Sequence, residues 1–255
     1  MSHAHPRPTP NAIILCGGFG TRLGSLTRAT PKPLLPVAGR PFLWHLLRHL
    51  SAQGIQRVIL ATHYLADQLR AFADSCGDEF GELVVSLERE AMGTGGAVRL
   101  AVERATSSTC VILNGDSVAT QPIAPLIEAH VASSAAFTLM AVRAERTLGG
   151  ARRKGCVRIG DDGALLNFSM RDEVDTGWIN AGVYVADRAL VRGWPSRRFD
   201  LEACLDELLQ GHRARVFQSP ASLLDIGTPE CYALAQDWIA GDGSISQLGH
   251  AAVAR

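Results

Sequence analysis

Short apolar runs alternate along this chain with segments of helical spacing, and this alternation limits the possible folds more than any other feature. The apolar runs are residues 11–16, 56–62, 82–88 and 109–117. The segments of helical spacing are residues 41–54, 65–77, 93–105 and 122–134. Apolar strands joined by helices form parallel sheets that are covered on both faces. The pattern predicts an α/β fold, with a Rossmann-like, mostly parallel sheet and helices on both faces.

The second half of the chain departs from this alternation. Residues 136–144 and 178–187 are predicted strands, and residues 155–170 are a predicted hairpin with Asp-Asp-Gly at its turn. We expect the hairpin to form a small antiparallel lobe over the ligand-binding edge of the sheet. The remaining predicted elements are a helix at 201–211, strands at 215–220 and 222–227, and a helix at 229–241.

Length, charge and cysteine content narrow the class of protein. The chain has 255 residues, which suits one large domain, and its 25 Lys and Arg balance its 25 Asp and Glu. A balanced charge argues against non-specific binding of nucleic acid or of a membrane surface. We expect no membrane span and no signal peptide, and therefore a cytoplasmic protein. The six cysteines form no CxxC pair, so structural zinc and a disulfide framework are not expected.

Three polar loops follow predicted strands, at 17–33, 88–96 and 114–117. In open α/β sheets the ligand binds at the carboxyl ends of the strands, where these loops lie. The first loop is rich in glycine, which lets backbone N–H groups approach an anion. Its cations include Arg22 and Lys32, and the lysine stands between two prolines. This loop predicts phosphate binding, although it lacks the Gly-Lys-Ser/Thr ending of a P-loop and the third glycine of GxGxxG.

Two aspartates end predicted strands that are distant in the sequence. Asp116 follows Asn-Gly at the end of one strand, and Asp225 stands in "LLDIG". Mg²⁺ is typically bound by one or two carboxylates together with phosphate oxygens and water. The alternative interpretation is that both residues form turns, which is common for Asp at strand ends. We expect Asp116 and Asp225 to hold a magnesium ion.

Five stretches together resemble the signature of the sugar-phosphate nucleotidyltransferases. They are "GGFGTRLGSLTRATPKP" (17–33), "GTGGA" (93–97), "NGD" (114–116), "INAGVYV" (179–185) and "DIGTPE" (225–230). The resemblance runs from residue 12 to about residue 240. It implies a GT-A-like nucleotidyltransferase fold in which the antiparallel lobe binds the sugar. The implied organisation is a single domain at 11–240, with a nucleotide half at about 11–135, a sugar half at about 136–240, and loose tails at 1–10 and 241–255.

The resemblance also implies a reaction and roles for individual residues. A nucleoside triphosphate and a sugar 1-phosphate would give a nucleotide-sugar and pyrophosphate, with Mg²⁺ as cofactor. Arg22, Lys32 and Asp116 would be catalytic, and Asp116 and Asp225 would hold the metal. The nucleotide would be bound by Leu15, Gly17, Gly18, Gly20, Thr21, Glu88, Gly93 and Thr94. The sugar phosphate would be bound by Asn114, Gly155, Arg171, Asn180 and Gly182.

The base and the sugar are less closely defined. In the resembling family the residue at Glu88 faces the base, and a carboxylate only accepts hydrogen bonds. Guanine offers two donors on one edge, so Glu88 favours GTP. The acceptor would be a heptose 1-phosphate or a mannose-like sugar 1-phosphate. The family usually has Glu and Lys where this chain has Met170 and Arg171, and the arginine would supply the cation. The downstream acids Asp172 and Glu173 are candidates for the missing carboxylate.

Alternatives remain open at this stage. The same chemistry could use UTP or CTP and another acceptor, such as N-acetylmuramate 1-phosphate. A non-catalytic nucleotide-sugar-binding regulatory protein could share the fold, although the intact cations and aspartates favour an enzyme. A dinucleotide-dependent oxidoreductase would need an acidic residue after the second strand, which here ends in "ATHY". We expect the substrates as the partners, with no nucleic acid and no membrane, and either a monomer or a homo-oligomer.

Overall fold

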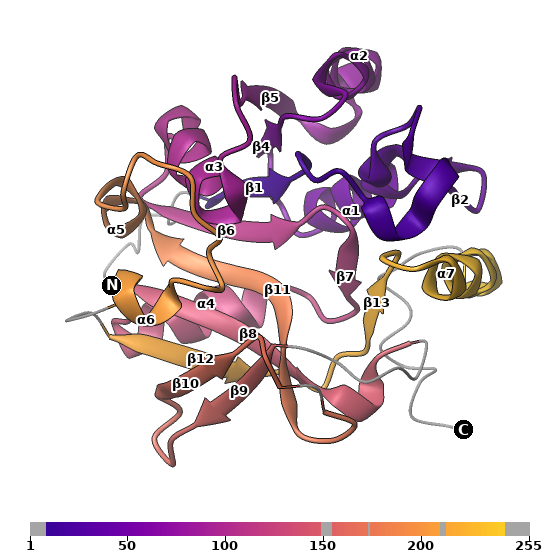
Figure 1. The fold of residues 1–255 in the computed structure, drawn as a ribbon. Coiled ribbons are helices and arrows are strands. Elements are labelled where there is room, and N and C mark those ends of the chain that lie inside the picture. Colours follow the sequence, from indigo (N-terminus) through magenta and orange to yellow (C-terminus); the bar gives the residue numbers. More distant parts are fainter. Residues whose placement is uncertain (1–8, 149–154, 173, 210–212, 243–255) are drawn as a thin grey trace, which may run out of the picture.

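A computed structural model of the chain describes residues 9–148, 155–172, 174–209 and 213–242. Most of the predicted tails, 1–10 and 241–255, and residue 173 lie outside these ranges. A nine-stranded sheet forms the centre of the described structure (Figure 1). Its main path runs in the order β10-β9-β11-β6-β1-β4-β5, and off this path β8 pairs with β11 and β12 pairs with β8.

The parallel part of the sheet is built from the four apolar runs of the first half. They form β1 (Asn11–Leu15), β4 (Arg57–Thr62), β5 (Glu82–Leu87) and β6 (Thr109–Asn114). The strand β1 lies between β4 and β6, so Ile13 is aligned with Ile59 on one side and Ile112 on the other. All three side chains are fully buried, as expected for strands covered on both faces.

The antiparallel part continues the same sheet. It contains β8 (Phe137–Arg143), β9 (Cys156–Ile159), β10 (Leu165–Ser169), β11 (Trp178–Asp187) and β12 (Ala214–Gln218). The long strand β11 pairs antiparallel with both β6 and β8, and it meets β9 where Ile179 is aligned with Cys156. The predicted hairpin is therefore confirmed as β9 and β10, but it extends the central sheet and does not form a separate layer.

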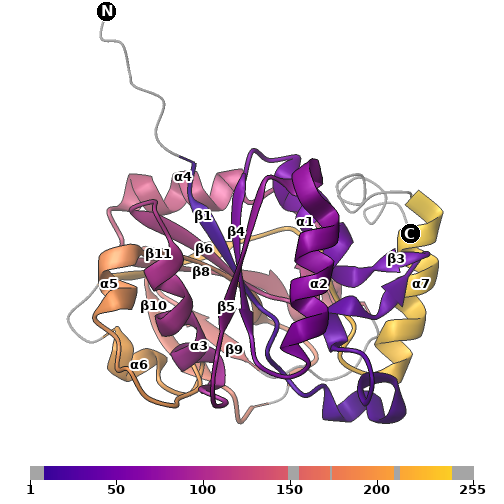
Figure 2. The same ribbon diagram turned by 90° about the horizontal axis from the view of Figure 1, so that it is seen from above.

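Helices cover both faces of the sheet (Figure 2). One face carries α1 (Phe42–Ser51), α2 (Ala66–Cys76), α4 (Ala124–Ser133) and α7 (Pro229–Asp242). The other face carries α3 (Gly93–Ala101), α5 (Arg188–Arg192) and α6 (Leu205–Leu208). Each face has its own apolar core, and the side chains of β1 alternate between the two. No helix in the described ranges is long and apolar enough to cross a membrane.

The predicted helix at 201–211 is wrong for most of its length. Only Leu205–Leu208 is helical, and residues 210–212 lie outside the described structure. The chain just before α6 is held against the start of α3, because Phe199 O accepts the N–H groups of Gly95 and Gly96. The Leu201 N–H likewise donates to Thr94 Oγ1. These contacts fix an irregular backbone where the apolar spacing alone predicts a helix.

Several short elements complete the described fold. The strand β7 (Ser117–Ala119) pairs with β13 (Leu223–Asp225), and β2 (Pro36–Val37) pairs with β3 (Arg40–Pro41). The 3₁₀ helices are η1 (Thr21–Thr27), η2 (Lys32–Leu34), η3 (Gly77–Phe80), η4 (Val102–Arg104) and η5 (Ala144–Arg146). The first lies inside the predicted phosphate-binding loop, and the second begins at its end.

Candidate active site

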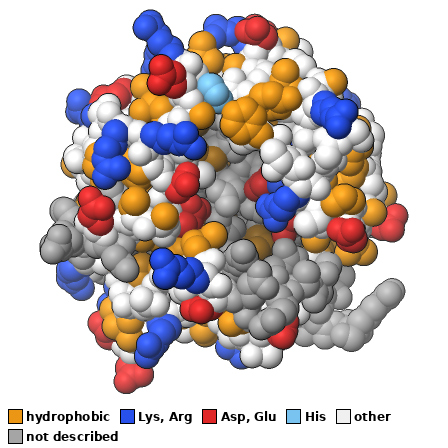
Figure 3. All heavy atoms as spheres, in the orientation of Figure 1, with side chains coloured by type: hydrophobic (Ala, Val, Ile, Leu, Met, Phe, Trp, Pro, Cys, Tyr) orange, Lys and Arg blue, Asp and Glu red, His pale blue; other side chains and the backbone are white. Residues whose placement is uncertain are grey.

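Three connected cavities lie along the carboxyl ends of β1, β4 and β6. We call them the central cavity, the Glu88 cavity and the hairpin-side cavity, and Figure 3 shows a face of the molecule that is hollowed at its centre. Leu15, Gly18 and Thr94 line both the central cavity and the Glu88 cavity. Arg22, Asn114, Asp116 and Glu202 line both the central cavity and the hairpin-side cavity. The loops predicted to bind the ligand therefore do meet at one edge of the sheet.

The glycine-rich loop forms one wall of the central cavity. Gly20 has a left-handed conformation (φ 63°), and its carbonyl accepts a hydrogen bond from Thr27 Oγ1 at 3.0 Å. A Cβ atom at Gly18 would meet no other atom within 4 Å, so the backbone there faces open space. Gly20 thus serves the turn itself, whereas Gly18 leaves room for a ligand to approach the backbone closely. Thr21 also lines this cavity.

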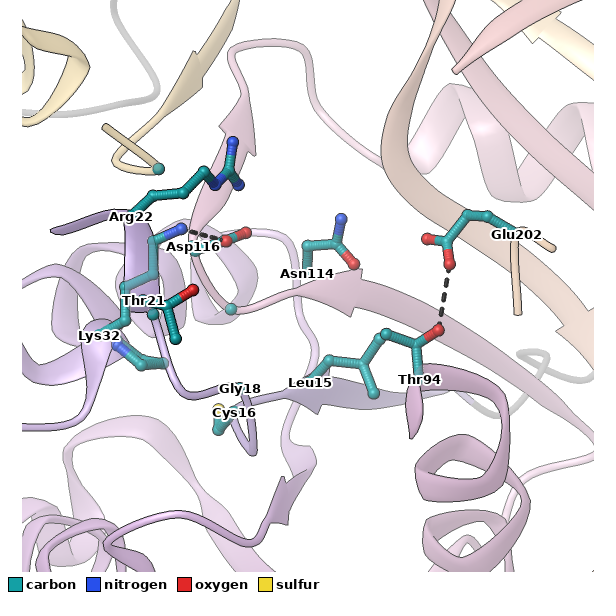
Figure 4. Close-up of a pocket in the computed structure, with 14 residues that line it drawn as sticks. Leu15, Cys16, Gly18, Thr21, Arg22, Lys32, Thr94, Asn114, Asp116 and Glu202 are labelled. Carbon is teal, nitrogen blue, oxygen red and sulfur yellow. Dashed lines mark hydrogen bonds and ion pairs between the residues drawn. The ribbon is translucent and has the colours of Figure 1, made fainter. Parts of the chain in front are cut away.

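Both predicted cations reach the central cavity. Lys32 is only 7% exposed, and its Nζ lies 2.5 Å from Asp116 Oδ2 (Figure 4). A Cβ atom built on Gly227 would lie 3.2 Å from Nη2 of Arg22 and 3.4 Å from Nζ of Lys32. The same atom would lie 2.8 Å from Oδ1 of Asp225. Two cations and two carboxylates therefore converge beside Gly227, and any larger residue there would press on them.

The local fold explains how two distant aspartates come together. The Gly115 N–H donates to Leu15 O at 3.0 Å, so the turn after β6 is tied to the end of β1. The pairing of β7 with β13 aligns Ser117 with Asp225, and the Ile226 N–H donates to Asp116 O at 2.9 Å. Both carboxylates line the hairpin-side cavity. The predicted pair is thus assembled by a two-stranded connection that the sequence pattern did not indicate.

The donor set at this pair fits one kind of metal better than others. Among the described residues, no group of three or more His, Cys, Asp or Glu side chains is arranged to hold a metal ion. Zinc sites that rely on protein ligands need at least three such side chains. Mg²⁺ is commonly held by one or two carboxylates, with substrate phosphates and water completing its octahedron. Asp116 and Asp225 fit that second pattern.

The Glu88 side chain is buried at the wall of the Glu88 cavity, although it follows the end of a strand. It is 5% exposed, and its Oε2 accepts the Met92 N–H at 2.9 Å. Its backbone carbonyl lies 3.2 Å from Nδ1 of His63. Burial raises the pKa of the Glu88 carboxyl, while the Met92 N–H and His63 partly offset that rise. Oε1 and one lone pair of Oε2 remain for a ligand, as an acceptor of two hydrogen bonds requires.

The backbone N–H groups at the start of α3 donate hydrogen bonds to other parts of the protein. The Gly95 and Gly96 N–H groups donate to Phe199 O at 3.0 and 3.3 Å, and the Thr94 N–H donates to Asp200 Oδ1 at 3.4 Å. A Cβ atom at Gly95 would lie 2.0 Å from the Phe199 ring. The glycines of "GTGGA" therefore make room for Phe199, and the helix N-terminus keeps few N–H groups for an anion. Gly93 and Thr94 still line the Glu88 cavity.

The hairpin-side cavity has a volume of about 650 Å³ and brings together four of the five residues predicted to bind the sugar phosphate. These four are Asn114, Gly155, Asn180 and Gly182. Gly182 has a positive φ of 70°, and a Cβ atom there would lie 2.4 Å from Nδ2 of Asn114. The fifth residue, Arg171, is exposed and lines none of the three cavities, whereas its neighbour Met170 does line this one.

Some residues of the cleft were missed by the sequence prediction. His63, Arg198 and Asp200 line the Glu88 cavity, and Glu202 lines the other two. Glu202 was missed because it lies in the segment wrongly predicted as a helix at 201–211. The helical spacing gave no reason to place Glu202 in a cleft. Cys16 lines the central cavity, but burial and the nearby Asp116 raise the pKa of its thiol. A thiol that stays protonated is not a nucleophile.

Comparisons with known proteins identify the family of this chain. The sequence profile of a family described as nucleotidyl transferase matches residues 11–240. The D-glycero-alpha-D-manno-heptose 1-phosphate guanylyltransferase of Aneurinibacillus thermoaerophilus is 33% identical over 229 residues, which cover 88% of this chain and 96% of that protein. The mannose-1-phosphate guanylyltransferase of Mycobacterium tuberculosis is 37% identical over 191 residues, which cover 74% of this chain but only 52% of that longer protein.

Solved structures show the same architecture. The crystal structure of HddC from Yersinia pseudotuberculosis, complexed with GMP-PN, has a TM-score of 0.77 and 29% sequence identity. That alignment covers 90% of this chain and 99% of the other. A putative glucose-1-phosphate thymidylyltransferase from Bacillus anthracis has a TM-score of 0.78 at 20% identity, which supports the fold alone. The predicted α/β fold with a mostly parallel sheet is confirmed.

Proposed function

The chain belongs to the nucleotidyl transferase family, and we propose that it transfers GMP from GTP to a sugar 1-phosphate, with release of pyrophosphate. The observation that carries this proposal is the convergence of Arg22, Lys32, Asp116 and Asp225 beside Gly227, next to the open backbone of Gly18. Its relatives among the guanylyltransferases support the choice of GTP and of a heptose or mannose 1-phosphate.

The chemistry requires charge control more than proton transfer. The second pKa of a sugar phosphate is about 6, so its attacking oxygen is already anionic at neutral pH. The difficulty is to bring this anion in line with a triphosphate that is itself highly negative. Catalysis then comes from positioning and from cations placed where charge develops. Lys32 and Arg22 are such cations, and the buried thiol of Cys16 is not needed as a nucleophile.

Each cation has a place in this scheme. Lys32 is held near the turn after β6 by two prolines and by Asp116, so its ammonium is fixed before the substrate arrives. It would lie between the α-phosphate and the attacking phosphate. Arg22 is exposed at the mouth of the central cavity, and its planar guanidinium suits the oxygens of the departing pyrophosphate. Both side chains would lower the repulsion between the two anionic substrates.

Asp116 and Asp225 would hold Mg²⁺ together with phosphate oxygens of the substrates. When bound, that ion would neutralise negative charge as it develops on the phosphates. In this arrangement Asp116 would orient Lys32 through one carboxylate oxygen and keep lone pairs for the metal. Asp225 accepts the Gly227 N–H through Oδ1 at 2.7 Å, which fixes its direction in the cleft.

Glu88 would read the guanine base. Its remaining lone pairs match the N1–H and N2–H donors of guanine, whereas uracil and thymine present one donor between two acceptors. The pairing of donors to a buried acceptor is a strong source of discrimination, because the wrong base leaves the carboxylate without partners. The acceptor sugar would occupy the hairpin-side cavity, beside Asn114 and Asn180.

A matrix of substrates tests the proposal. GTP, ATP, UTP and CTP are each combined with a panel of sugar 1-phosphates, and pyrophosphate release is followed in the presence of Mg²⁺. We expect the fastest release with GTP and with a heptose or mannose 1-phosphate. A preference for UTP or CTP would contradict the assignment of Glu88. Tight nucleotide-sugar binding without turnover for any pair would favour a regulatory protein.

A further inference from the structure

A line of hydrogen bonds crosses the cleft from the hairpin-side cavity to the start of α3. The Asn180 Nδ2–H group donates to the Tyr184 hydroxyl at 2.6 Å, and that hydroxyl donates to Glu202 Oε1 at 3.0 Å. Thr94 Oγ1 donates to the other oxygen, Oε2, at 3.0 Å, as the dashed line in Figure 4 marks. The Leu201 N–H donates to Thr94 Oγ1 at 2.8 Å. Glu202 thus stands at the centre of a connected set of polar groups.

The carboxylate at the centre fixes the direction of every bond in this line. A carboxylate can only accept, so both hydroxyl groups must donate to it. The Tyr184 hydroxyl then has only lone pairs left, and it must accept from the amide nitrogen of Asn180. The tyrosine is fully buried, and burial together with the charge of Glu202 raises its pKa, so it keeps the proton that it donates.

The orientation of the Asn180 amide follows from this. With Nδ2 directed to Tyr184, the amide oxygen Oδ1 accepts the Gly182 N–H at 2.9 Å. Both bonds agree on one orientation of the amide, although an amide group alone could face either way. These two bonds leave the second N–H of Nδ2 unused, and Asn180 lines the hairpin-side cavity. Glu202, through Tyr184, therefore holds the Asn180 amide in the same orientation that the Gly182 N–H favours.

Glu202 also supplies the hairpin-side cavity with a carboxylate that lies outside the cluster beside Gly227. Three acidic residues line this cavity in the described structure, and two of them, Asp116 and Asp225, lie within the cluster beside Gly227. Met170 lines the same cavity with a thioether, which is at best a weak acceptor. Each oxygen of Glu202 accepts one protein hydroxyl, so each keeps a lone pair, and the side chain is only partly buried.

We propose that Glu202 determines which sugar is accepted, by accepting a hydrogen bond from one hydroxyl group of the sugar 1-phosphate and by holding the Asn180 amide through Tyr184. This inference rests on the proposed function, since it names how that same site recognises its acceptor. A hydrogen bond to a charged group typically changes an affinity by about 10- to 100-fold. An acceptor without the matching hydroxyl should lose about that factor in kcat/KM.

The test removes single hydroxyl groups from the sugar 1-phosphate and, separately, the negative charge from Glu202. The value of kcat/KM is measured at saturating GTP for the best sugar 1-phosphate and for its monodeoxy analogues. In the unaltered protein, one analogue should be about 10- to 100-fold poorer through loss of this bond. In Glu202→Gln the penalty for that analogue should shrink by roughly tenfold, because a neutral amide bonds a hydroxyl more weakly. Penalties at the other positions should stay the same.

A second variant separates the two roles of Glu202. Tyr184→Phe removes the link to Asn180 but leaves Glu202 held by Thr94. We expect the KM for the sugar 1-phosphate to rise about 5- to 10-fold, as for loss of one hydrogen bond, while the deoxy penalty at the Glu202 position persists. The KM for GTP should change less than about twofold in both variants. Tyr232→Phe and Glu103→Gln are the matched controls, because Tyr232 donates to Pro36 O and Glu103 accepts from Arg99, and neither residue lines the three cavities.

The outcomes distinguish a purely structural role of Glu202 from a role in recognising the sugar. An equal loss for all analogues in Glu202→Gln, or an equal rise in both KM values, would assign Glu202 a purely structural role and overturn the inference. If Glu202→Gln fails to fold, Glu202→Asp provides the same comparison, because the shorter side chain withdraws the carboxylate from the hydroxyl. Unaltered protein that releases no pyrophosphate with any pair of substrates would contradict the proposed function itself. Activity with unchanged discrimination would contradict this inference alone.

Discussion

Asp116 and Lys32 hold each other in this structure, although the proposed reaction gives each of them a further partner. Their short contact of 2.5 Å joins an almost fully buried ammonium to a carboxylate that is about one-third exposed. A buried lysine without a counter-charge would be costly. Asp116 therefore supplies the counter-charge beside Lys32, and it is the same residue that we propose as a ligand of Mg²⁺.

We predict that Asp116→Asn lowers turnover by about 10²- to 10³-fold, the usual effect of losing one preorganised charge contact. The dissociation constant for GTP should change far less, because the glycine-rich loop and Glu88 remain. Stopped assays of pyrophosphate release and a separate binding titration would measure the two effects. Asp74→Asn, on the exposed side of α2, is the control. Full activity of the unaltered protein in a chelator would remove Asp116 from a metal site.

Glu88 gives a prediction about pH. Burial raises the pKa of this carboxyl, so it takes up a proton at a higher pH than an ordinary glutamate. Protonation turns one acceptor into a donor and spoils the match to guanine. As the pH falls from neutral through this raised pKa, the preference for GTP over UTP should therefore decrease. Comparing the two nucleotides cancels the titration of their phosphates, which is the same in both.

The variant Glu88→Gln provides the internal control for that pH dependence. It should weaken the use of GTP and relax the choice of base at every pH, since an amide offers one acceptor and one donor group. The ratio of GTP to UTP should also become independent of pH. A ratio that still varies with pH in Glu88→Gln would show that a different group, such as His63, reads the base.

Sequence reasoning could find residues of the cleft only where a motif or a strand end marked them. Glycines, cations and aspartates at strand ends were marked in this way, and the structure brings most of them to one edge. Glu202 had no such mark, because its position depends on contacts with Thr94 and Tyr184 from other elements. Arg171 was predicted to bind the sugar phosphate because it stands where the resembling family has a lysine. Its side chain is exposed and lines none of the three cavities.

At the scale of elements, helix α1 contains two buried histidines, His45 and His49. The His45 ring bonds to Val37 O at 2.8 Å, whereas neither ring nitrogen of His49 meets the geometry of a full hydrogen bond. Burial lowers the pKa of His49 to about 4, although the nearby backbone of Gln121 offsets part of the effect. The pKa of His45 is lowered as well, again mainly by burial. The folded helix thus holds both rings neutral.

This arrangement predicts a loss of stability in mild acid. Unfolding frees the His49 ring to take up a proton at its ordinary pKa, so below about pH 6.5 the unfolded chain binds more protons than the folded one. The free energy of unfolding should fall as the pH drops from about 6.5 toward 4, by about 3 kcal/mol from His49 alone. Urea titrations at several pH values measure this. His49→Leu should flatten the slope, and the remainder belongs to His45 and His130, whose pKa is also lowered by burial.

Most elements could be predicted, and the exceptions have one cause. Strands buried on both faces and amphipathic helices are set by local apolar spacing, so β1, β4, β6 and α1 agree with the sequence to within a few residues. The missed elements are short, and they owe their form to distant partners. The strand β7 exists because β13 pairs with it, and the helix predicted at 201–211 is interrupted because Phe199 caps α3.

At the scale of the whole molecule, the sheet does not divide between the two halves. The strand β6 from the first half lies between β1 and β11, and β11 carries the hairpin that extends the sheet. The apolar core on each face also draws residues from both halves, such as Leu46 and Val183 on one face. The two halves proposed for nucleotide and sugar therefore share both apolar cores.

We predict that the chain unfolds as a single unit. Circular dichroism of the backbone and tryptophan fluorescence should give coincident transitions in urea, because separating the halves would strip β6 of β11 and expose both cores. Trp44 on α1 and Trp178 on β11 report on the two halves. Single-tryptophan variants can follow each separately. Two transitions with different midpoints would instead make the halves independent domains.

The pairing of β7 with β13 has a consequence for the synthesis of the protein on the ribosome. The residues of β1, β4, β5 and β6 are synthesised first, together with the segments between and after them that contain the glycine-rich loop, Lys32 and Asp116. Asp225 and Gly227 are joined to the chain much later, so the cluster of charges beside Gly227 stays incomplete until then. The residues that we propose for nucleotide binding are thus all present before the cluster can be completed, and the cluster becomes complete only at a late stage of synthesis.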